Sequence, residues 1–281
     1  MNRRHLPLIV ISDVHLGTYG CHATELLLYL KSVQPGTLIL NGDIIDGWQF
    51  SKSYFPPAHF AVIREIFKLI TLGTKVIYLT GNHDEFLRKY TGLEIGNIHL
   101  ANKYLLNIDD KTMWFFHGDV FDNSTKGFAK ILARLGGKGY DLLILMNRAV
   151  NYLLKLTGRE RVSFSKKIKN SVKQAIAFIN DFEQTIAALA IEKQYDYVVC
   201  GHIHQPTKKV IETETGFVNY LNSGDWIENL TALEYDNKEW KIFQYNDADF
   251  ILERAMLPSF KNKKAVDTET EISFLYNLKN Y

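Results

Sequence analysis

Short apolar runs alternate with longer stretches of helical periodicity over the first 120 residues, and this alternation allows few folds. Residues 8–11, 37–40 and 75–79 have the length and nearly continuous apolar character of strands buried on both faces. Between them, residues 22–32 and 58–71 carry apolar side chains at helical spacing. Strands separated by helices predict βαβ units and a mostly parallel sheet.

Later segments are short strands joined by turn residues. Residues 104–108 and 112–116 flank Asp109-Asp110-Lys111 and predict a β-hairpin. Further strand-like segments, which favour a meander over more βαβ units, cover residues 197–200, 208–212, 217–221, 231–235 and 240–245. The whole pattern predicts an α/β fold in which two sheets pack face to face with helices outside, giving four layers in the order α/β/β/α.

One long segment of helical pattern interrupts this scheme. We expect residues 1–121 and 194–257 to form the core, residues 122–193 to form an inserted helical cap, and residues 258–281 to form a polar C-terminal tail. Residues 140–156 are apolar on nearly all sides. Asn147, Arg148 and Asn151 interrupt them, however, which argues against a membrane span.

Composition and charge indicate an ordinary globular protein whose charge is unevenly distributed along the sequence. Hydrophobic residues make up 46% and charged residues 23%, which excludes a disordered or fibrous chain. Two cysteines, Cys21 and Cys200, are too few for a disulfide framework and fit a reducing compartment. The formal net charge is +2, but residues 126–173 hold twelve Lys and Arg against two acidic residues. A segment with a net charge of +10 is therefore inserted into a remainder with a net charge of −8. Such an uneven distribution of charge indicates the kind of partner that the protein binds rather than its fold.

Polar motifs follow predicted strands at five places. In chain order they are Ser12-Asp13-Val14-His15, Asn41-Gly42-Asp43, Gly81-Asn82-His83-Asp84, His117-Gly118-Asp119 and Gly201-His202-Ile203-His204. Loops at the carboxyl ends of strands are where open α/β sheets place their ligand sites. The D-x-H and H-x-H spacings would put alternate side chains on one side of an extended loop. Any one motif alone would suit a surface loop or a core histidine, but five in this arrangement predict a site.

The donors in these motifs suit two metal ions. Three oxygen donors and four imidazoles are too many for one divalent ion, and fit two ions about 3.5–4 Å apart that share a carboxylate. Mixed histidine and carboxylate donors favour Mn, Fe or Zn over Ca or Mg. The candidate ligands are Asp13, His15, Asp43, Asn82, His117, His202 and His204.

The series D-x-H, G-D, G-N-H-D, H-G-D, G-H-x-H resembles that of the calcineurin-like metallophosphoesterases, over about residues 8–225 outside the insertion. The resemblance implies the metallophosphoesterase sandwich and in-line attack of water on phosphorus, with two ions that lower the water's pKa and neutralise phosphate charge. It implies a first ion held by Asp13, His15, Asp43 and His204, and a second held by Asp43, Asn82, His117 and His202. It also implies that His83 contacts the scissile phosphate as an electrophile or leaving-group acid, oriented by Asp84. The alternative for His83 is a structural role outside the ligand shell.

A narrower resemblance is to the UDP-2,3-diacylglucosamine pyrophosphohydrolases of lipid A biosynthesis. It is carried by N-G-D-I-I-D at residues 41–46, by the H-G-D motif that leads into the insertion, and by G-H-I-H-Q-P at residues 201–206. It implies a cytoplasmic, manganese-dependent enzyme, peripheral to the inner face of the cell membrane. Such an enzyme releases UMP and a diacylated glucosamine 1-phosphate, and its cap clamps the acyl chains. The candidate substrate-binding residues are Arg161, Lys167, Asn170 and Lys173.

The cap sequence is compatible with a lipid substrate. Residues 140–156 could line an acyl slot, and the basic residues nearby could meet anionic head groups at about 1 kcal/mol each near a membrane surface. The alternative is that the apolar helix is the cap's own core and the lysines form a solvated face.

Two departures from the narrower family lie where substrate should bind. His83 stands where that family usually carries arginine, and residues 120–124 lack its cysteine and paired aspartates. Another phospholipid, a soluble nucleotide, a phosphoprotein or a nucleic acid is therefore an alternative substrate. The long apolar helix within the basic segment makes nucleic acid the less attractive choice. A protein-binding scaffold is a third alternative, against which the complete donor set argues.

Overall fold

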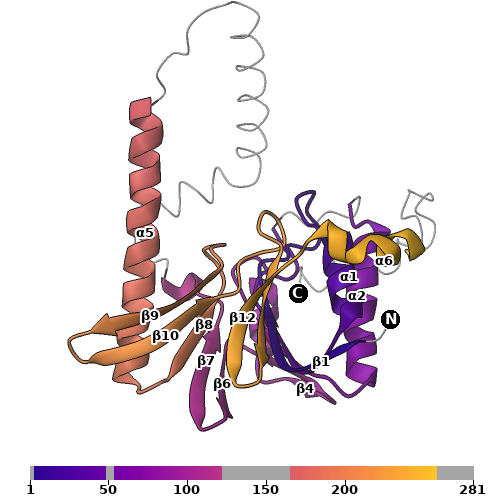
Figure 1. Ribbon diagram of the computed structural model, residues 1–281, viewed down its shortest axis with the longest axis horizontal. Coiled ribbons are helices and arrows are strands. Elements are labelled where there is room, and N and C mark those ends of the chain that lie inside the picture. Colours follow the sequence, from indigo (N-terminus) through magenta and orange to yellow (C-terminus); the bar gives the residue numbers. More distant parts are fainter. Residues whose placement is uncertain (1–2, 49–53, 122–164, 258–281) are drawn as a thin grey trace, which may run out of the picture. The chain divides into compact units, whose positions relative to one another are not determined.

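The computed structural model describes residues 3–48, 54–121 and 165–257, and within the last range it describes side chains from residue 177 onwards (Figure 1). The chain divides into two compact units, one of residues 1–119 and 186–281 and the other of residues 120–185. The first unit contains both sheets and all candidate metal ligands. Most of the expected cap and all of the expected tail lie outside the described residues.

The larger sheet has seven strands in the order β12-β11-β1-β2-β3-β5-β4. Four neighbouring strands are parallel, namely β1 (Arg4–Ile11), β2 (Val33–Asn41), β3 (Lys75–Leu79) and β5 (Ile98–Ala101). The helices α1 (Ala23–Ser32) and α2 (Pro57–Thr71) connect the first three of them, which confirms the predicted βαβ units. The strands β4 (Glu94–Ile95), β11 (Thr231–Asp236) and β12 (Glu239–Gln244) are antiparallel to their neighbours.

The smaller sheet has five strands in the order β6-β7-β8-β10-β9. Its strands are β6 (Lys103–Ile108), β7 (Lys111–Phe116), β8 (Tyr197–Cys200), β9 (Thr207–Thr213) and β10 (Gly216–Asn222). β6 and β7 form the predicted hairpin. β7, β8 and β10 are parallel neighbours, so their carboxyl ends lie at one edge of this sheet.

The predicted meander is wrong. β10 lies between β8 and β9, parallel to the first and antiparallel to the second. β11 and β12 then join the other sheet, where β11 pairs with β1. The turn residues correctly indicate the local pairs β9–β10 and β11–β12. They carry no information about the sheet to which each pair belongs.

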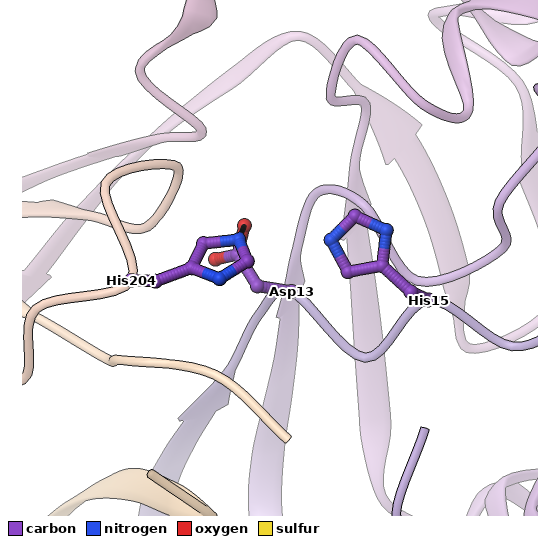
Figure 2. Close-up of side chains that lie close together, drawn as sticks. All are labelled: Asp13, His15 and His204. Carbon is purple, nitrogen blue, oxygen red and sulfur yellow. Dashed lines mark ion pairs between the residues drawn. The ribbon is translucent and has the colours of Figure 1, made fainter. Parts of the chain in front are cut away.

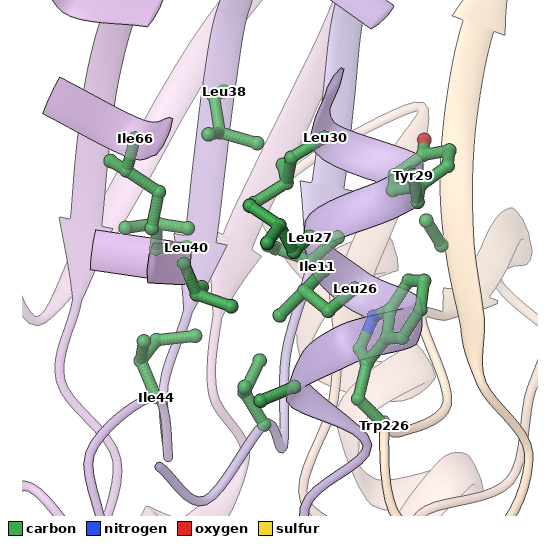
Figure 3. Close-up of a cluster of buried hydrophobic side chains, with 14 of the residues drawn as sticks. Ile11, Leu26, Leu27, Tyr29, Leu30, Leu38, Leu40, Ile44, Ile66 and Trp226 are labelled. Atoms are coloured by element: carbon green, nitrogen blue, oxygen red, sulfur yellow. The ribbon is translucent and has the colours of Figure 1, made fainter. Parts of the chain in front are cut away.

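The core consists of two hydrophobic clusters on opposite faces of the larger sheet. In β1, Ile9 and Ile11 belong to the cluster that includes α1 and α2, whereas Leu8 and Val10 belong to the cluster between the two sheets. Figure 3 shows α1 side chains, among them Leu26, packed in the first of these clusters. Burial on both faces explains why the strand sequences are nearly continuous apolar runs.

A helix also packs against the outer face of the smaller sheet. The last residues of α5 (Ser165–Glu192) belong to the first unit, and Ile186, Ala187 and Ala190 are buried there. A Cβ atom added at Gly216 of β10 would lie 3.1 Å from the Ile191 side chain, so this end of the helix packs on that strand. The predicted sandwich of two sheets with outer helices is therefore confirmed, and both sheets are mixed.

The remaining elements are short. They are η1 (Glu85–Tyr90), η3 (Asp247–Phe250) and α6 (Ile251–Met256). Among the described helices, none combines the length and the apolar character that crossing a membrane requires.

Candidate metal centre

The five predicted motifs meet where the carboxyl ends of parallel strands from both sheets come together. Asp13, Asp43 and Asn82 follow β1, β2 and β3, and His117 follows β7 directly. Hydrogen bonds join these loops. The His202 amide after β8 donates to Asp13 Oδ2 at 3.0 Å, and the His83 amide donates to Asp43 Oδ1 at 2.8 Å. The predicted convergence therefore occurs.

The backbone at the candidate ligands is not extended. Five of the seven candidates have left-handed backbone conformations, with φ angles of 52° to 68°, namely Asp13, His15, Asp43, His202 and His204. The expectation of extended D-x-H and H-x-H loops is therefore wrong, although the side chains do converge. Left-handed residues other than glycine are uncommon and cluster at functional sites, where the surrounding structure holds them.

Two groups of three side chains match the two expected ion sites. Asp13, His15 and His204 form the first (Figure 2), and Asp43, His117 and His202 form the second; in each, the potential ligand atoms lie within 4.8 Å of one another. A third group, His15, Asp43 and His83, overlaps both. Such clusters are typical of a dinuclear metal site.

Unpaired buried atoms show that these residues fit metal ions. Asp13 Oδ1, His15 Nε2, Asn82 Oδ1 and His117 Nε2 are buried without a hydrogen-bond partner. Asp13 Oδ1 lies 3.1 Å from His204 Nε2 without forming a hydrogen bond with it. Two ligands of an octahedral ion with bonds of about 2.1 Å lie about 3 Å apart. Leaving such atoms buried and unpaired is costly, and a metal ion would satisfy them.

In two of the candidate histidines, the Nδ1 atom already contacts another group, which leaves Nε2 for a metal ion. His117 Nδ1 lies 2.9 Å from the Asn41 carbonyl oxygen, to which it can only donate, and this bond leaves Nε2 with its lone pair available. His15 Nδ1 lies 3.2 Å from the Asp46 carboxylate. Partners of this kind fix the tautomer and the ring orientation of metal-binding histidines.

Charge pairing controls the pKa values at the centre. Burial raises the pKa of Asp13, but the neighbouring His204 outweighs burial and brings the pKa to about 2. Burial lowers the pKa of His204, and Asp13 more than compensates, raising it to about 9. The His117 ring likewise lowers the pKa of Asp43 against the effect of burial. The carboxylates are therefore ionised, which is the form that binds a metal ion.

Asp46 is a residue of this site that the sequence analysis did not select. Its Oδ2 atom lies 2.8 Å from His83 Nδ1 as well as 3.2 Å from His15 Nδ1, and its Oδ1 atom accepts a hydrogen bond from the Trp48 amide at 3.0 Å. Burial lowers the pKa of His83, but the carboxylates of Asp46 and Asp43 together outweigh burial and the net shift is upward. The feature of the sequence that could have identified Asp46 is its position as a second carboxylate three residues after Asp43.

Asp84 has a different role from the expected one. It is fully buried and accepts hydrogen bonds from the amides of Ile44 and Gly81 and from the hydroxyl of Tyr78, at 2.6 to 2.9 Å. Burial, with the nearby Asp43 charge, raises its pKa to about 6. Asp84 therefore ties the loop after β3 to the loop after β2, while the carboxylate that contacts the His83 ring is that of Asp46.

Glycines allow the loops to approach one another closely. A Cβ atom at Gly201 would lie 2.5 Å from both Asp13 Oδ2 and Ser12 Oγ, and one at Gly81 would overlap Asp43. The backbone of one loop thus packs directly against the candidate ligand of another. Any side chain at Gly81 or Gly201 would displace a carboxylate.

The expected substrate-binding residues cannot be placed around this centre. Arg161 lies outside the described residues. Lys167, Asn170 and Lys173 lie on the part of α5 whose side chains are not described. Their roles stay predictions.

Comparison with known proteins agrees with the motifs. The family model described as calcineurin-like phosphoesterase matches residues 6–206. The UDP-2,3-diacylglucosamine hydrolase of Neisseria gonorrhoeae is 26% identical over 233 residues, which cover 81% of this chain and 92% of that protein. The protein of the same name from Aliivibrio fischeri is 21% identical over 243 residues, covering 84% and 98%. Among solved structures, a dimetal phosphatase from Danio rerio has a TM-score of 0.39 and 14% identity, covering 85% and 95%.

Proposed function

This chain belongs to the calcineurin-like phosphoesterases, and from that premise we propose that it cleaves the pyrophosphate of a UDP-linked diacylated glucosamine to UMP and 2,3-diacylglucosamine 1-phosphate. The class of the enzyme is a metal-dependent phosphoesterase hydrolase. The observation that carries the chemistry is the pair of three-residue clusters with unpaired buried donor atoms. The substrate is supported by relatives that cover nearly the whole chain and carry that name.

In this proposal each predicted ligand has one role. Asp13, His15 and His204 would hold the first ion, Asn82, His117 and His202 would hold the second, and Asp43 would contribute to both sites. We propose Mn²⁺ for both ions, with Fe or Zn as the other metals that this donor set suits. Bound ions of this kind lower the pKa of a water and neutralise charge on the phosphate.

His83 acts on the phosphate from outside the ligand shell. With Nδ1 held by Asp46, its Nε2 atom is free to donate a hydrogen bond to a phosphate oxygen or to the leaving group. A protonated imidazole would stabilise the negative charge that develops during the reaction. Asp46 supports this form because its carboxylate lies 2.8 Å from the ring.

The cap would supply the lipid specificity. The basic residues Arg161, Lys167 and Lys173, with Asn170, would bind the sugar phosphate, and the apolar stretch at residues 140–156 would hold acyl chains. The enzyme would act in the cytoplasm as a peripheral protein on the inner face of the cell membrane. The local charge of +10 supports binding to an anionic surface and to an anionic substrate.

Substrate comparison tests this proposal. Purified chain with Mn²⁺ is given UDP-2,3-diacylglucosamine in detergent micelles, and UMP release is measured by chromatography beside hydrolysis of bis-p-nitrophenyl phosphate. The proposal predicts a kcat/KM for the lipid nucleotide at least 100-fold above that for the diester. Asp43→Ala should abolish both activities while the chain stays folded. Hydrolysis of the diester without release of UMP would refute the lipid substrate and favour another phospholipid or nucleotide phosphoester.

A further inference from the structure

The loop between β10 and β11 contacts both halves of the first ion site without supplying a ligand. This segment, residues 222–229, starts at the last residue of β10, which is the parallel neighbour of β8. Its first five residues are buried: Asn222, Ser223, Gly224, Asp225 and Trp226. The two residues that it connects, Asp13 and His204, come from different sheets and are 191 positions apart in the sequence.

On one side, the loop holds the segment that carries Asp13. The Trp226 amide donates to the Asp13 carbonyl oxygen at 3.1 Å. Ser12, the residue before Asp13, is held by its hydroxyl, which lies 2.6 Å from Ser223 Oγ and donates to the Gly224 carbonyl oxygen at 3.1 Å. Trp226 itself is buried in the cluster under α1, so this anchor rests on the hydrophobic core.

On the other side, the loop holds the segment that carries His204. Asn222 Nδ2 donates to the Gly201 carbonyl oxygen at 2.7 Å, and Asn229 Nδ2 donates to the His204 carbonyl oxygen at 2.9 Å. The His204 backbone has a φ of 53°, a conformation that costs free energy and needs surrounding contacts to persist. The bond from Asn229 is such a contact, made directly to the peptide group of the strained residue.

A buried carboxylate fixes the shape of the loop. Asp225 Oδ1 accepts hydrogen bonds from the amides of Ile227, Glu228 and Asn229 at 2.5 to 3.2 Å. Asp225 Oδ2 accepts from Asn229 Nδ2 at 2.6 Å. The Asn229 Nδ2 atom therefore donates to both Asp225 and His204, and so links the two residues.

We infer that residues 222–229 position Asp13 and His204 for the first ion, with Asn229 as the positioning residue for His204. The inference rests on the proposed two-ion centre. The second site is held by other contacts, which are the Asn41 carbonyl oxygen at His117 and the His83 amide at Asp43. Loss of Asn229 therefore weakens one of the two ion sites selectively.

The test is Mn²⁺ binding by Asn229→Ala, measured by isothermal titration calorimetry and by electron paramagnetic resonance of the free ion. We expect one of two binding events to weaken about 10–100-fold, the effect typical of partners outside the ligand shell, while the other event is unchanged. Asn219→Ala is the matched control, because Asn219 Nδ2 also donates to a backbone carbonyl oxygen, that of Asp196, at 3.0 Å. It should leave both events intact.

The outcomes separate this inference from the proposed function. Two unchanged binding events in Asn229→Ala, or equal weakening of both, overturn the positioning role and leave the two-ion centre standing. A wild-type chain that binds no Mn²⁺, Fe or Zn refutes the centre itself. If Asn229→Ala does not fold, Asn229→Ser serves in its place, since serine is polar at this turn but too short to reach the His204 carbonyl.

Discussion

His83 and Asp46 form the pair of residues on which the catalytic part of the account depends. Asp46 is almost fully buried, and its carboxylate contacts both a candidate ligand, His15, and His83. In the proposed centre, this single carboxylate would orient one ring for metal binding and the other for the phosphate. Because Nδ1 of each ring contacts Asp46, Nε2 of His15 is left for a metal ion and Nε2 of His83 is left for the phosphate.

His83→Ala is expected to reduce kcat about 10²–10⁴-fold, the usual contribution of a general acid, with the metal content unchanged. The measurements are steady-state kinetics and elemental analysis of the same preparation. His5→Ala, at an exposed histidine on β1, is the control and should match the wild type in both. An ion lost from His83→Ala would instead make His83 a ligand.

His59 is a buried histidine whose titration bears on stability. It is 3% exposed, and its Nδ1 atom accepts a hydrogen bond from the Gly17 amide at 2.9 Å. Burial lowers its pKa to about 4 from an ordinary value of 6.5. The unfolded chain therefore binds more protons between pH 6.5 and 4, so that the free energy of unfolding falls as the pH decreases through this window.

The expected loss of stability from His59 is at most about 3 kcal/mol, since each pKa unit corresponds to about 1.4 kcal/mol. His59→Asn, whose Oδ1 atom can also accept from the Gly17 amide, should show a smaller decrease in unfolding free energy between pH 6.5 and 4 than the wild type. Urea unfolding of the metal-loaded protein measures it. An identical pH dependence in both chains would show that His59 is not buried as described.

At the scale of elements, the close approach of strand-end loops determines the site. Gly201 follows β8, and an added methyl group would lie 2.5 Å from Asp13 Oδ2. Gly201→Ala should therefore displace Asp13, weaken ion binding and cost about 1–3 kcal/mol of stability through overpacking. Gly92→Ala is the control for ion binding. Its backbone φ of 91° makes the alanine strained, but an added methyl group there meets no atom within 4 Å. Equal Mn²⁺ affinity in the two variants, measured by calorimetry, would contradict the close packing at Gly201.

The elements differ in how far their sequences predict them. Apolar burial on both faces is a local pattern, so β3 and β8 are predicted with their observed limits, and α2 differs from prediction by one residue at its start. The place of β10 between β8 and β9 depends on pairing between distant segments, which no local pattern contains.

The candidate site likewise has some features that the sequence predicts and others that it does not. The types and spacing of histidine and aspartate predict which donors converge, because the chemistry of a metal centre limits the choice. The left-handed backbone of Asp13 and the contacts from Asp46 and Asn229 depend on the packing of loops from both sheets. Sequence spacing does not predict them.

At the scale of the whole molecule, ion binding and folding should be coupled. The proposed first site takes donors from the loops after β1 and β8, which belong to different sheets, so bound ions would hold the two sheets together. A ligand present at 100 times its Kd stabilises the folded state by about 2.7 kcal/mol per site. We expect Tm to rise with Mn²⁺ and to fall with EDTA. Asp13→Ala should retain only part of this shift, and a Tm independent of Mn²⁺ and EDTA would contradict the coupling.

The division of charge is also a property of the whole chain. The near-neutral total of +2 combines a segment of +10 with a remainder of −8, and that remainder includes the buried Asp13 and Asp43. The acidic charges at the centre suit metal cations, and the basic segment suits an anionic substrate or surface. Ionic strength should therefore affect KM for the lipid nucleotide more than kcat.

The number of metal ions bound per chain tests the central claim most directly. Chain purified without chelator and loaded with Mn²⁺ is measured by native mass spectrometry and by elemental analysis, beside His117→Ala. The account predicts two ions in the wild type and at most one in the variant. One ion or none in the folded wild-type chain would contradict it.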